Sequence, residues 1–250
     1  MAYAKGLILI PARYNSYRLP GKALKDIAGK TMIRRTYERC ALSGIRAMVV
    51  TDDKRIVNEC LNHGIPVDLV TEPCKTGTDR VARCALRQHP PADWYINVQG
   101  DEPFANPEDI LKVAHQMDTG DHREVVNGMS LIKNPDDLYN VTIPKVIAWD
   151  GLLKYMSRAP VPYPYGPTEE LWKRSGYQQV CVYGFFLHHL KHFLKFEEKT
   201  YYESIEDIEI LRFHETGIPV RMLVLQGSPL HVDTMEDLNR AQFIAKEHNA

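Results

Sequence analysis

Four short apolar runs, each followed by a segment with helical spacing, constrain the fold of this chain more than any other feature. The runs and the helical segments that follow them occupy residues 6–10 and 32–43, 47–51 and 54–63, 67–70 and 79–88, and 94–98 with the stretch that opens at Pro107. Short, mainly apolar strands that alternate with helices are typical of a mostly parallel sheet flanked by helices. We therefore predict an α/β fold whose ligands bind at the carboxyl ends of the strands.

The second half of the chain has a different pattern. Residues 144–148 and 152–156 flank an Asp150-Gly151 pair, which predicts a β-hairpin. Residues 159–166 are rich in Pro and Tyr and predict an irregular segment. Further elements are expected at residues 180–186 (strand), 206–215 (helix), 220–225 (strand) and 235–246 (helix).

The organisation and composition of the chain exclude several classes of protein. No long linker interrupts the pattern, so we expect a single domain over residues 1–250 with an insertion at 130–185. The formal net charge of −1 gives no general attraction to nucleic acid or to an anionic membrane. The five cysteines are an odd number and form no CxxC pair, which argues against a disulfide framework and suits a reducing compartment. The N-terminal apolar run of about six residues is too short to span a membrane. We expect a cytoplasmic protein without membrane insertion.

A basic loop follows the first expected strand. Arg13, Arg18 and Lys22 lie within ten residues, and Gly21 precedes the lysine. Fork-shaped guanidinium groups and a compact ammonium group match the phosphate oxygens of a triphosphate. The loop lacks the complete P-loop pattern, so a solvated basic loop stays open as the alternative.

Two acidic positions are candidates for a metal site. Asp101 and Glu102 follow the fourth expected strand. Mg²⁺ prefers one or two carboxylates together with phosphate oxygens, which makes Asp101 a candidate ligand, with a turn cap as the alternative. Asp233 becomes a second ligand if the fold brings it beside Asp101. Otherwise it belongs to the start of the last helix, where Thr234 and Asp237 form a capping-box pattern.

Two further segments carry polar side chains that suit a ligand. The segment from Thr76 to Arg80 follows the third strand, where it can begin a helix or contact a base through backbone and hydroxyl groups. Arg158, at the exit of the hairpin, can bind a substrate carboxylate through two parallel hydrogen bonds, or lie on the surface.

Seven motifs in order resemble the 3-deoxy-manno-octulosonate (Kdo) cytidylyltransferases, also called CMP-Kdo synthetases. They run from Leu7 to Leu238 and read IPARYNSYRLPGK, TGTDR, NVQGDEP, YMSRAPVPY, VYGFF, ESIEDIEILR and VDTMEDL. The resemblance implies a Rossmann-like nucleotidyltransferase fold, Mg²⁺ as cofactor, and a homodimer formed through the hairpin insertion. It also implies that CMP passes from CTP to the anomeric hydroxyl of a 3-deoxy-2-keto sugar acid, with release of pyrophosphate, for lipopolysaccharide or capsule synthesis.

Roles for individual residues follow from the matching motifs. The resemblance implies that the catalytic residues are Arg13, Lys22, Asp101 and Asp233, of which Asp101 and Asp233 bind Mg²⁺. The implied nucleotide-binding residues are Arg13, Arg18, Lys22, Thr76, Gly77 and Arg80. The implied sugar-acid-binding residues are Gln99, Arg158, Gln179, Tyr183 and Glu209.

Four places depart from the family pattern, although the phosphate and metal positions match it. Cys74-Lys75-Thr76 replaces His-x-Ser, Gln179 replaces a His, Ile210 replaces a Gln, and Thr142 replaces an Asn. A pocket that hydrogen-bonds a sugar hydroxyl discriminates strongly against analogues. We therefore expect either Kdo or a modified acid such as 8-amino-Kdo as the substrate.

Other functions stay open. CMP transfer to another acceptor, a nonulosonate or an alditol phosphate, would use the same motifs. A nucleotide-sugar glycosyltransferase usually holds its metal with Asp-x-Asp, whereas this chain has Gly100-Asp101-Glu102-Pro103. A catalytically inactive nucleotide-binding module is disfavoured, because both candidate metal ligands are present.

Overall fold

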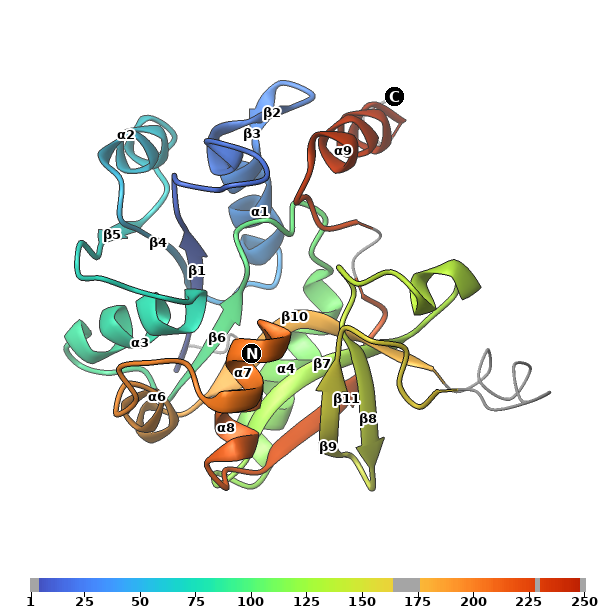
Figure 1. The fold of residues 1–250 in the computed structure, drawn as a ribbon. Helices are drawn as coiled ribbons and strands as arrows, with labels where there is room; N and C mark the ends of the chain where they lie inside the picture. Colours follow the sequence, from blue (N-terminus) through green and yellow to red (C-terminus); the bar gives the residue numbers. More distant parts are fainter. Residues whose placement is uncertain (1–4, 164–175, 228–229, 248–250) are drawn as a thin grey trace.

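A nine-stranded mixed sheet forms the centre of the computed structural model (Figure 1), which describes residues 5–163, 176–227 and 230–247. The strands lie in the order β5-β4-β1-β6-β10-β7-β11-β9-β8. Their bounds are β1 Gly6–Ala12, β4 Ala47–Thr51, β5 Val67–Leu69, β6 Trp94–Val98, β7 Val125–Leu131, β8 Lys145–Trp149, β9 Leu152–Ser157, β10 Tyr177–Phe185 and β11 Val220–Val224. The helices of the described part are α1 Met32–Ala41, α2 Lys54–Asn62, α3 Gly77–Arg87, α4 Pro107–Thr119, α6 Leu187–Phe193, α7 Tyr201–Glu206, α8 Leu211–Glu215 and α9 Met235–Glu247, with 3-10 turns η1 Lys22–Leu24 and η2 Pro135–Leu138.

The four strands predicted from the apolar runs pair in parallel. β1 lies between β4 and β6, with Ile8 beside Ala47 and Gly6 beside Trp94, and β5 pairs with the far side of β4. All seven residues of β1 are buried, because helices cover both faces of a sheet of this kind. Parallel strands bring their carboxyl ends to one edge, so the loops after β1 and β6 meet there.

β10 changes the direction of the sheet. It runs antiparallel to β6 on one side and to β7 on the other. A bulge interrupts its pairing with β7 between Val180 and Tyr183. There Asn127 Nδ2 donates to the carbonyl oxygens of Val180 and Val182, at 3.0 and 3.1 Å. Because a buried carbonyl without a partner is costly, these hydrogen bonds stabilise the bulge.

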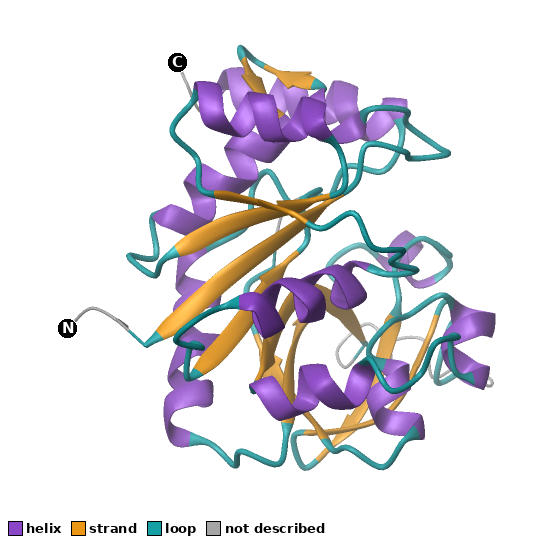
Figure 2. Cartoon of the chain, turned by 90° about the vertical axis from the view of Figure 1, so that its left-hand side faces the viewer, coloured by secondary structure: helices purple, strands orange, loops and turns teal. Residues whose placement is uncertain are grey.

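Helices cover both faces of the sheet (Figure 2). Successive side chains of a strand point to opposite faces. Accordingly, Ile8 and Ile10 of β1 belong to the apolar core that includes residues of α1 and α4, whereas Leu7 and Leu9 belong to the core that includes residues of α3, α6 and α8. No helix in the described ranges is long and apolar enough to cross a bilayer.

The last helix, α9, packs beside a small separate hairpin formed by β2 (Asp26–Ile27) and β3 (Lys30–Thr31) (Figure 1). Its apolar residues share a third core cluster with Leu19. The predicted capping box is confirmed, because Asp237 N donates to Thr234 Oγ1 at 3.2 Å and Thr234 N donates to Asp237 Oδ2 at 2.9 Å. This packing brings the segment before α9 to the loop after β1.

The helix predicted over residues 206–215 is wrong in its first half. α7 ends at Glu206 and α8 begins at Leu211. Between them, Asp207 has a φ of 53°, a left-handed conformation that ends a helix. Helical spacing of apolar residues does not reveal such a break, which leaves Glu209 on a turn between two helices.

The β-hairpin predicted at residues 144–148 and 152–156 is present as β8 and β9. Asp150 and Gly151 have φ values of 54° and 69°, as the tight turn of such a hairpin requires. The end of the predicted irregular segment 159–166, like residues 164–175 of the predicted insertion, lies outside the described residues.

Candidate active site

A cavity of about 430 Å³ lies at the carboxyl ends of β1 and β6, where the sequence predicts the ligand site. Every residue to which the motifs assign a role lines this cavity, namely Arg13, Arg18, Lys22, Thr76, Gly77, Arg80, Gln99, Asp101, Arg158, Gln179, Tyr183, Glu209 and Asp233. Segments far apart in the sequence therefore meet at one place, while the roles of the individual residues stay predictions.

Lys22 lies between the two acidic side chains that are candidate metal ligands. Its Nζ donates to Asp101 Oδ2 at 2.6 Å and to Asp233 Oδ1 at 2.8 Å. The preceding Gly21 has a φ of 66°, which glycine adopts without strain and which turns the chain sharply into η1. Burial alone would lower the pKa of Lys22, but the attraction of both carboxylates outweighs burial and raises it.

Asp233 reaches this place from the segment before α9. Val232 N donates to the carbonyl oxygen of Asp101 at 3.0 Å, which fixes that segment to the end of β6. Arg18 Nη2 lies 2.9 Å from Asp233 Oδ2. Burial would raise the pKa of Asp233, but the nearby charges of Lys22 and Arg18 outweigh it and lower the pKa. Asp101 and Asp233 therefore converge, which the sequence alone left open.

The start of α3 carries two of the predicted nucleotide-binding residues. Asp79 N donates to Thr76 Oγ1 at 3.1 Å and Thr76 N donates to Asp79 Oδ2 at 2.8 Å, which forms a capping box. Gly77 allows a close approach, because a Cβ at this position would lie 2.9 Å from Gln99 Oε1. The helix start is thus both rigid and in direct contact with the end of β6.

Arg80 and Arg158, both predicted to contact substrates, donate hydrogen bonds to backbone carbonyl oxygens and, from Arg80, to the carboxylate of Asp52. Arg80 Nη1 donates to the carbonyl oxygen of Val70 at 2.8 Å and Nη2 to Asp52 Oδ2 at 2.9 Å. The Arg158 guanidinium donates to the carbonyl oxygens of Glu206, Val141, Thr142 and Asp207. These bonds position the cavity wall, and direct contacts of the two arginines with substrates stay predictions.

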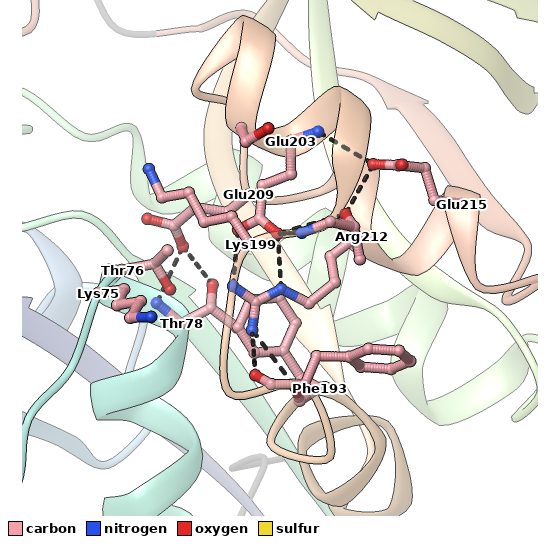
Figure 3. A network of polar contacts seen from close by, with 12 residues as sticks. Lys75, Thr76, Thr78, Phe193, Lys199, Glu203, Glu209, Arg212 and Glu215 are labelled. Carbon is pink, nitrogen blue, oxygen red and sulfur yellow. Dashed lines mark hydrogen bonds and ion pairs between the residues drawn. The ribbon is translucent and has the colours of Figure 1, made fainter.

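Glu209 joins the turn between α7 and α8 to the start of α3 (Figure 3). Its Oε1 accepts from Gly77 N at 3.0 Å, and its Oε2 accepts from Thr78 N at 2.9 Å and from Thr78 Oγ1 at 2.5 Å. An anion is favoured at a helix N-terminus, where backbone N–H groups lack partners within the helix. Glu209 therefore lines the cavity and holds α3 at the same time.

Replacing Glu209 with Gln should change the pH dependence of stability. Burial raises the pKa of Glu209 above its usual 4.5, although hydrogen bonds from Thr78 and Gly77 oppose this. A raised pKa in the folded state favours the protonated form there, so the stability that this group contributes is greatest below the unfolded pKa and is lost as the pH rises through the folded pKa. The free energy of unfolding of the wild type, relative to Glu209→Gln, should therefore fall as the pH rises above about 4 in urea titrations. A difference that rises over this range would show that the hydrogen bonds outweigh burial.

A buried network of ion pairs, centred on Arg212, lies close to this turn (Figure 3). Arg212 is 1% exposed, and its Nε and Nη2 donate to the two carboxylate oxygens of Glu203 at 2.6 and 2.8 Å. Its Nη1 lies 3.3 Å from Asp79 Oδ1 and donates to the carbonyl oxygen of Phe193, also at 3.3 Å. The network thus connects α8 with the same Asp79 that caps α3.

A fixed group of polar side chains lines another part of the cavity, at the bulge of β10. Gln179 Nε2 donates to Asn127 Oδ1 at 3.0 Å and to the hydroxyl of Tyr183 at 3.2 Å. Burial raises the pKa of Tyr183 well above its usual range, so its hydroxyl stays neutral. A few fixed polar groups of this kind orient a ligand through its hydroxyl groups.

Three of the four departures from the family pattern contribute to the cavity. Cys74, Gln179 and Thr142 line it. Ile210, in contrast, is 1% exposed and packs within the apolar core. The expectation that Ile210 alters the sugar pocket is therefore wrong, because the side chain that follows Glu209 turns into the core.

The sequence pattern does not indicate several residues that line the cavity. Ser130 lies in β7, which was not predicted because polar residues and a glycine interrupt its apolar run. Asp207 was assigned to a continuous helix, and Lys199 lies in a loop without a pattern. His231 also lines the cavity, and its position two residues before Asp233 was a usable signal.

The carboxylates around Lys22 suit a divalent cation. Asp101 and Asp233 each direct one oxygen at the same ammonium group, which stands in for a cation at this point. The described ranges contain no group of three or more His, Cys, Asp or Glu side chains that could hold a metal ion. Two carboxylates completed by phosphate oxygens and waters are typical of Mg²⁺. The residues therefore fit such an ion together with a phosphorylated ligand.

Comparisons with known proteins agree with one another. A family model described as cytidylyltransferase matches residues 7–223. The 3-deoxy-manno-octulosonate cytidylyltransferase of Coxiella burnetii is 35% identical over 243 residues, covering 94% of this chain and 97% of the relative. The protein of the same name from Neisseria gonorrhoeae is 35% identical over 247 residues, covering 95% and 97%. That from Alcanivorax borkumensis is 32% identical over 240 residues, covering 93% and 95%.

Two solved structures show the same arrangement of elements. The structure of a CMP:2-keto-3-deoxy-manno-octonic acid synthetase complexed with CTP matches with a TM-score of 0.88 and 30% identity, covering 98% of this chain and 100% of the other. The 4-diphosphocytidyl-2C-methyl-D-erythritol synthase of Anaerococcus prevotii matches with a TM-score of 0.64 and 14% identity, covering 98% and 97%. The second likeness concerns the fold alone.

Proposed function

This chain belongs to the cytidylyltransferase family, and we propose that it transfers CMP from CTP to the anomeric hydroxyl of Kdo, with release of pyrophosphate. The observation that carries the proposal is the cavity in which Lys22, Asp101 and Asp233 converge, and which Gln179 and Tyr183 also line. A cavity with charged groups for phosphates and fixed polar groups for hydroxyls suits both substrates. The likeness to Kdo cytidylyltransferases over nearly the whole chain supports this enzyme activity.

In the proposed reaction, the anomeric oxygen attacks the α-phosphorus of CTP in line. The new P–O bond forms as the bond to pyrophosphate breaks, and the proton of the anomeric hydroxyl passes to solvent. Arg13 and Arg18, on the loop after β1, neutralise the charge that develops on the leaving pyrophosphate. The rigid start of α3 and the wall around Gln179 hold the two substrates in position, which supplies much of the rate. The reaction needs no covalent intermediate with the protein.

Asp101 and Asp233 are the residues that would hold Mg²⁺. When bound there, the ion supplies Lewis-acid stabilisation of the phosphate charge. The chain keeps both carboxylates directed at one point: Val232 N donates to the carbonyl oxygen of Asp101 at 3.0 Å, and Asp233 N donates to Asp237 Oδ2 at 3.1 Å. Such support of the ligands preserves metal-site geometry.

We also propose that the protein is a homodimer that works in the cytoplasm, where its product serves lipopolysaccharide or capsule synthesis. Leu131, Trp149 and Tyr163, all within the predicted insertion at residues 130–185, have exposed fractions of 44%, 77% and 73%. Large apolar side chains that are exposed to solvent are typical of an interaction surface. This supports a dimer contact through the insertion.

Pyrophosphate release from CTP and Mg²⁺ should be much faster with Kdo than with other acceptors. We expect kcat/KM for Kdo to exceed the values for a nonulosonate and for an alditol phosphate by at least about 100-fold, because a site that hydrogen-bonds hydroxyls discriminates against mismatched analogues. The relatives named above are Kdo enzymes, which favours Kdo over 8-amino-Kdo; both acids belong in the panel, because Gln179 and Thr142 line the cavity. A reaction without acceptor controls for hydrolysis of CTP.

The panel separates the proposal from its alternatives. Release with 8-amino-Kdo alone would keep the chemistry and change the substrate. Release with a nonulosonate or an alditol phosphate alone would assign another acceptor. No release with any acceptor would overturn the proposed function, and sugar transfer from a nucleotide-sugar donor would then indicate a glycosyltransferase.

A further inference from the structure

We propose that Lys22 and the divalent cation compete for the same two carboxylates, so that the protein binds the cation firmly only when a nucleoside triphosphate draws Lys22 away. This inference rests on the proposed function, because it takes Asp101 and Asp233 as the metal ligands. It couples the two binding events, because the metal ion binds firmly only when the nucleotide is also bound.

The geometry carries the first step. Lys22 Nζ lies 2.6 Å from Asp101 Oδ2 and 2.8 Å from Asp233 Oδ1, so the ammonium fills the point at which the two carboxylates converge. Mg²⁺ binds oxygen at 2.0–2.1 Å. A metal ion coordinated by both oxygens therefore leaves no room for the ammonium at its hydrogen-bonding distances. One cation or the other occupies this position.

The balance of charge carries the second step. Asp101 and Asp233 together carry two negative charges, and Lys22 and Arg18 bring two positive charges to them. The side chains of Lys22, Asp101 and Asp233 are only 17%, 26% and 16% exposed, so water screens these ion pairs less than those on the open surface. A divalent cation gains little electrostatic attraction from a cluster that is already neutral.

The character of the lysine side chain carries the third step. Lys22 is a point charge on a flexible four-carbon stem, and Arg13 and Arg18 lie on the same loop and line the same cavity. A triphosphate offers oxygens to which the ammonium can donate instead of to the carboxylates. Transfer of Lys22 from the carboxylates to the phosphates releases the pair for the metal ion, so the substrate itself prepares the metal site.

Binding of Mn²⁺ to the protein without CTP or sugar acid tests the proposal. Mn²⁺ is the probe, and its free concentration is measured by electron paramagnetic resonance. We expect weak binding by the wild type and at least about tenfold tighter binding by Lys22→Met, because that variant leaves two partly buried carboxylates without their cation. Adding Asp101→Asn to Lys22→Met should abolish the gain, which would assign the ion to this pair.

Lys30→Met is the matched control. Lys30 Nζ contacts Glu38 Oε2 at 2.6 Å, and neither residue lines the cavity, so this variant should bind Mn²⁺ as the wild type does. Lys22→Gln, checked like Lys22→Met for an unchanged melting curve, repeats the test with a polar side chain. If the folded Lys22 variants bind Mn²⁺ no more tightly than the wild type, the competition does not exist. Since neither substrate is present, an inactive enzyme would leave this result intact.

Discussion

Asp101→Asn should lower kcat/KM for pyrophosphate release by at least about 100-fold, because even groups that only support a metal ligand contribute 10- to 100-fold. Asp101 follows β6 and shares Lys22 with Asp233, at 2.6 and 2.8 Å. An asparagine keeps the shape of the side chain but carries no charge to bind a divalent cation at the phosphates. Steady-state kinetics with CTP, Kdo and Mg²⁺ measure the loss.

The same strand offers a matched control. Asp93 precedes the first residue of β6, at the opposite end from the cavity, and its side chain is 61% exposed and 3.8 Å from Lys5 Nζ. Asp93→Asn makes the same chemical change and should leave kcat/KM unaltered. Near-normal turnover by Asp101→Asn would show that Asp101 is not a metal ligand and has no essential part in the proposed mechanism.

Arg212→Met should destabilise the fold by about 3–5 kcal/mol, since it leaves a buried carboxylate without its charge partner. Glu203 is 0% exposed and receives two hydrogen bonds from Arg212, at 2.6 and 2.8 Å (Figure 3). Asp79 loses its contact with Arg212 as well. Urea denaturation followed by circular dichroism measures the free energy of unfolding.

Two further variants show whether burial of the charge is the cause. Arg212→Met combined with Glu203→Gln removes the unpaired charge and keeps an oxygen that can accept from Thr200 N at the start of α7, so part of the stability should return. Arg34→Met breaks a more exposed ion pair, in which Arg34 Nε lies 3.0 Å from Glu38 Oε1, and should cost less than about 1 kcal/mol. Equal losses from Arg212→Met and Arg34→Met would show that burial of the charge is not the cause.

The sequence predicted the parallel part of the fold well, because β1 is a continuous apolar run and β6 is apolar except for Asn97, so that local pattern indicates their burial. It failed where long-range contacts decide the structure. β7 contains Asn127 and Gly128, whose places are set by the bulge of β10 and by close packing against Val180. The break at Asp207 depends on a single left-handed residue, which helical spacing does not reveal.

The location of the site was predictable, whereas the partners of its charges were not. Strand ends in an α/β sheet meet at one edge, so the motifs indicated a common cavity. The sign of a charge does not say what it contacts. Thus the sequence suggested phosphate for Lys22, which contacts Asp101 and Asp233, and a substrate for Arg80, which donates to Asp52 and a carbonyl group.

The convergence of three distant segments has a consequence for how the protein is made. Lys22 precedes Asp101 by 79 positions and Asp233 by 211. Ribosomes add about 5–20 residues per second and release the N-terminal part first. A nascent chain can therefore complete the parallel strands β1, β4, β5 and β6 and pair Lys22 with Asp101 while its second acid is still to be synthesised. Unfinished chains, however well folded in that part, lack half of the carboxylate pair, so the cation site proposed above can form only after the segment before α9 has left the ribosome.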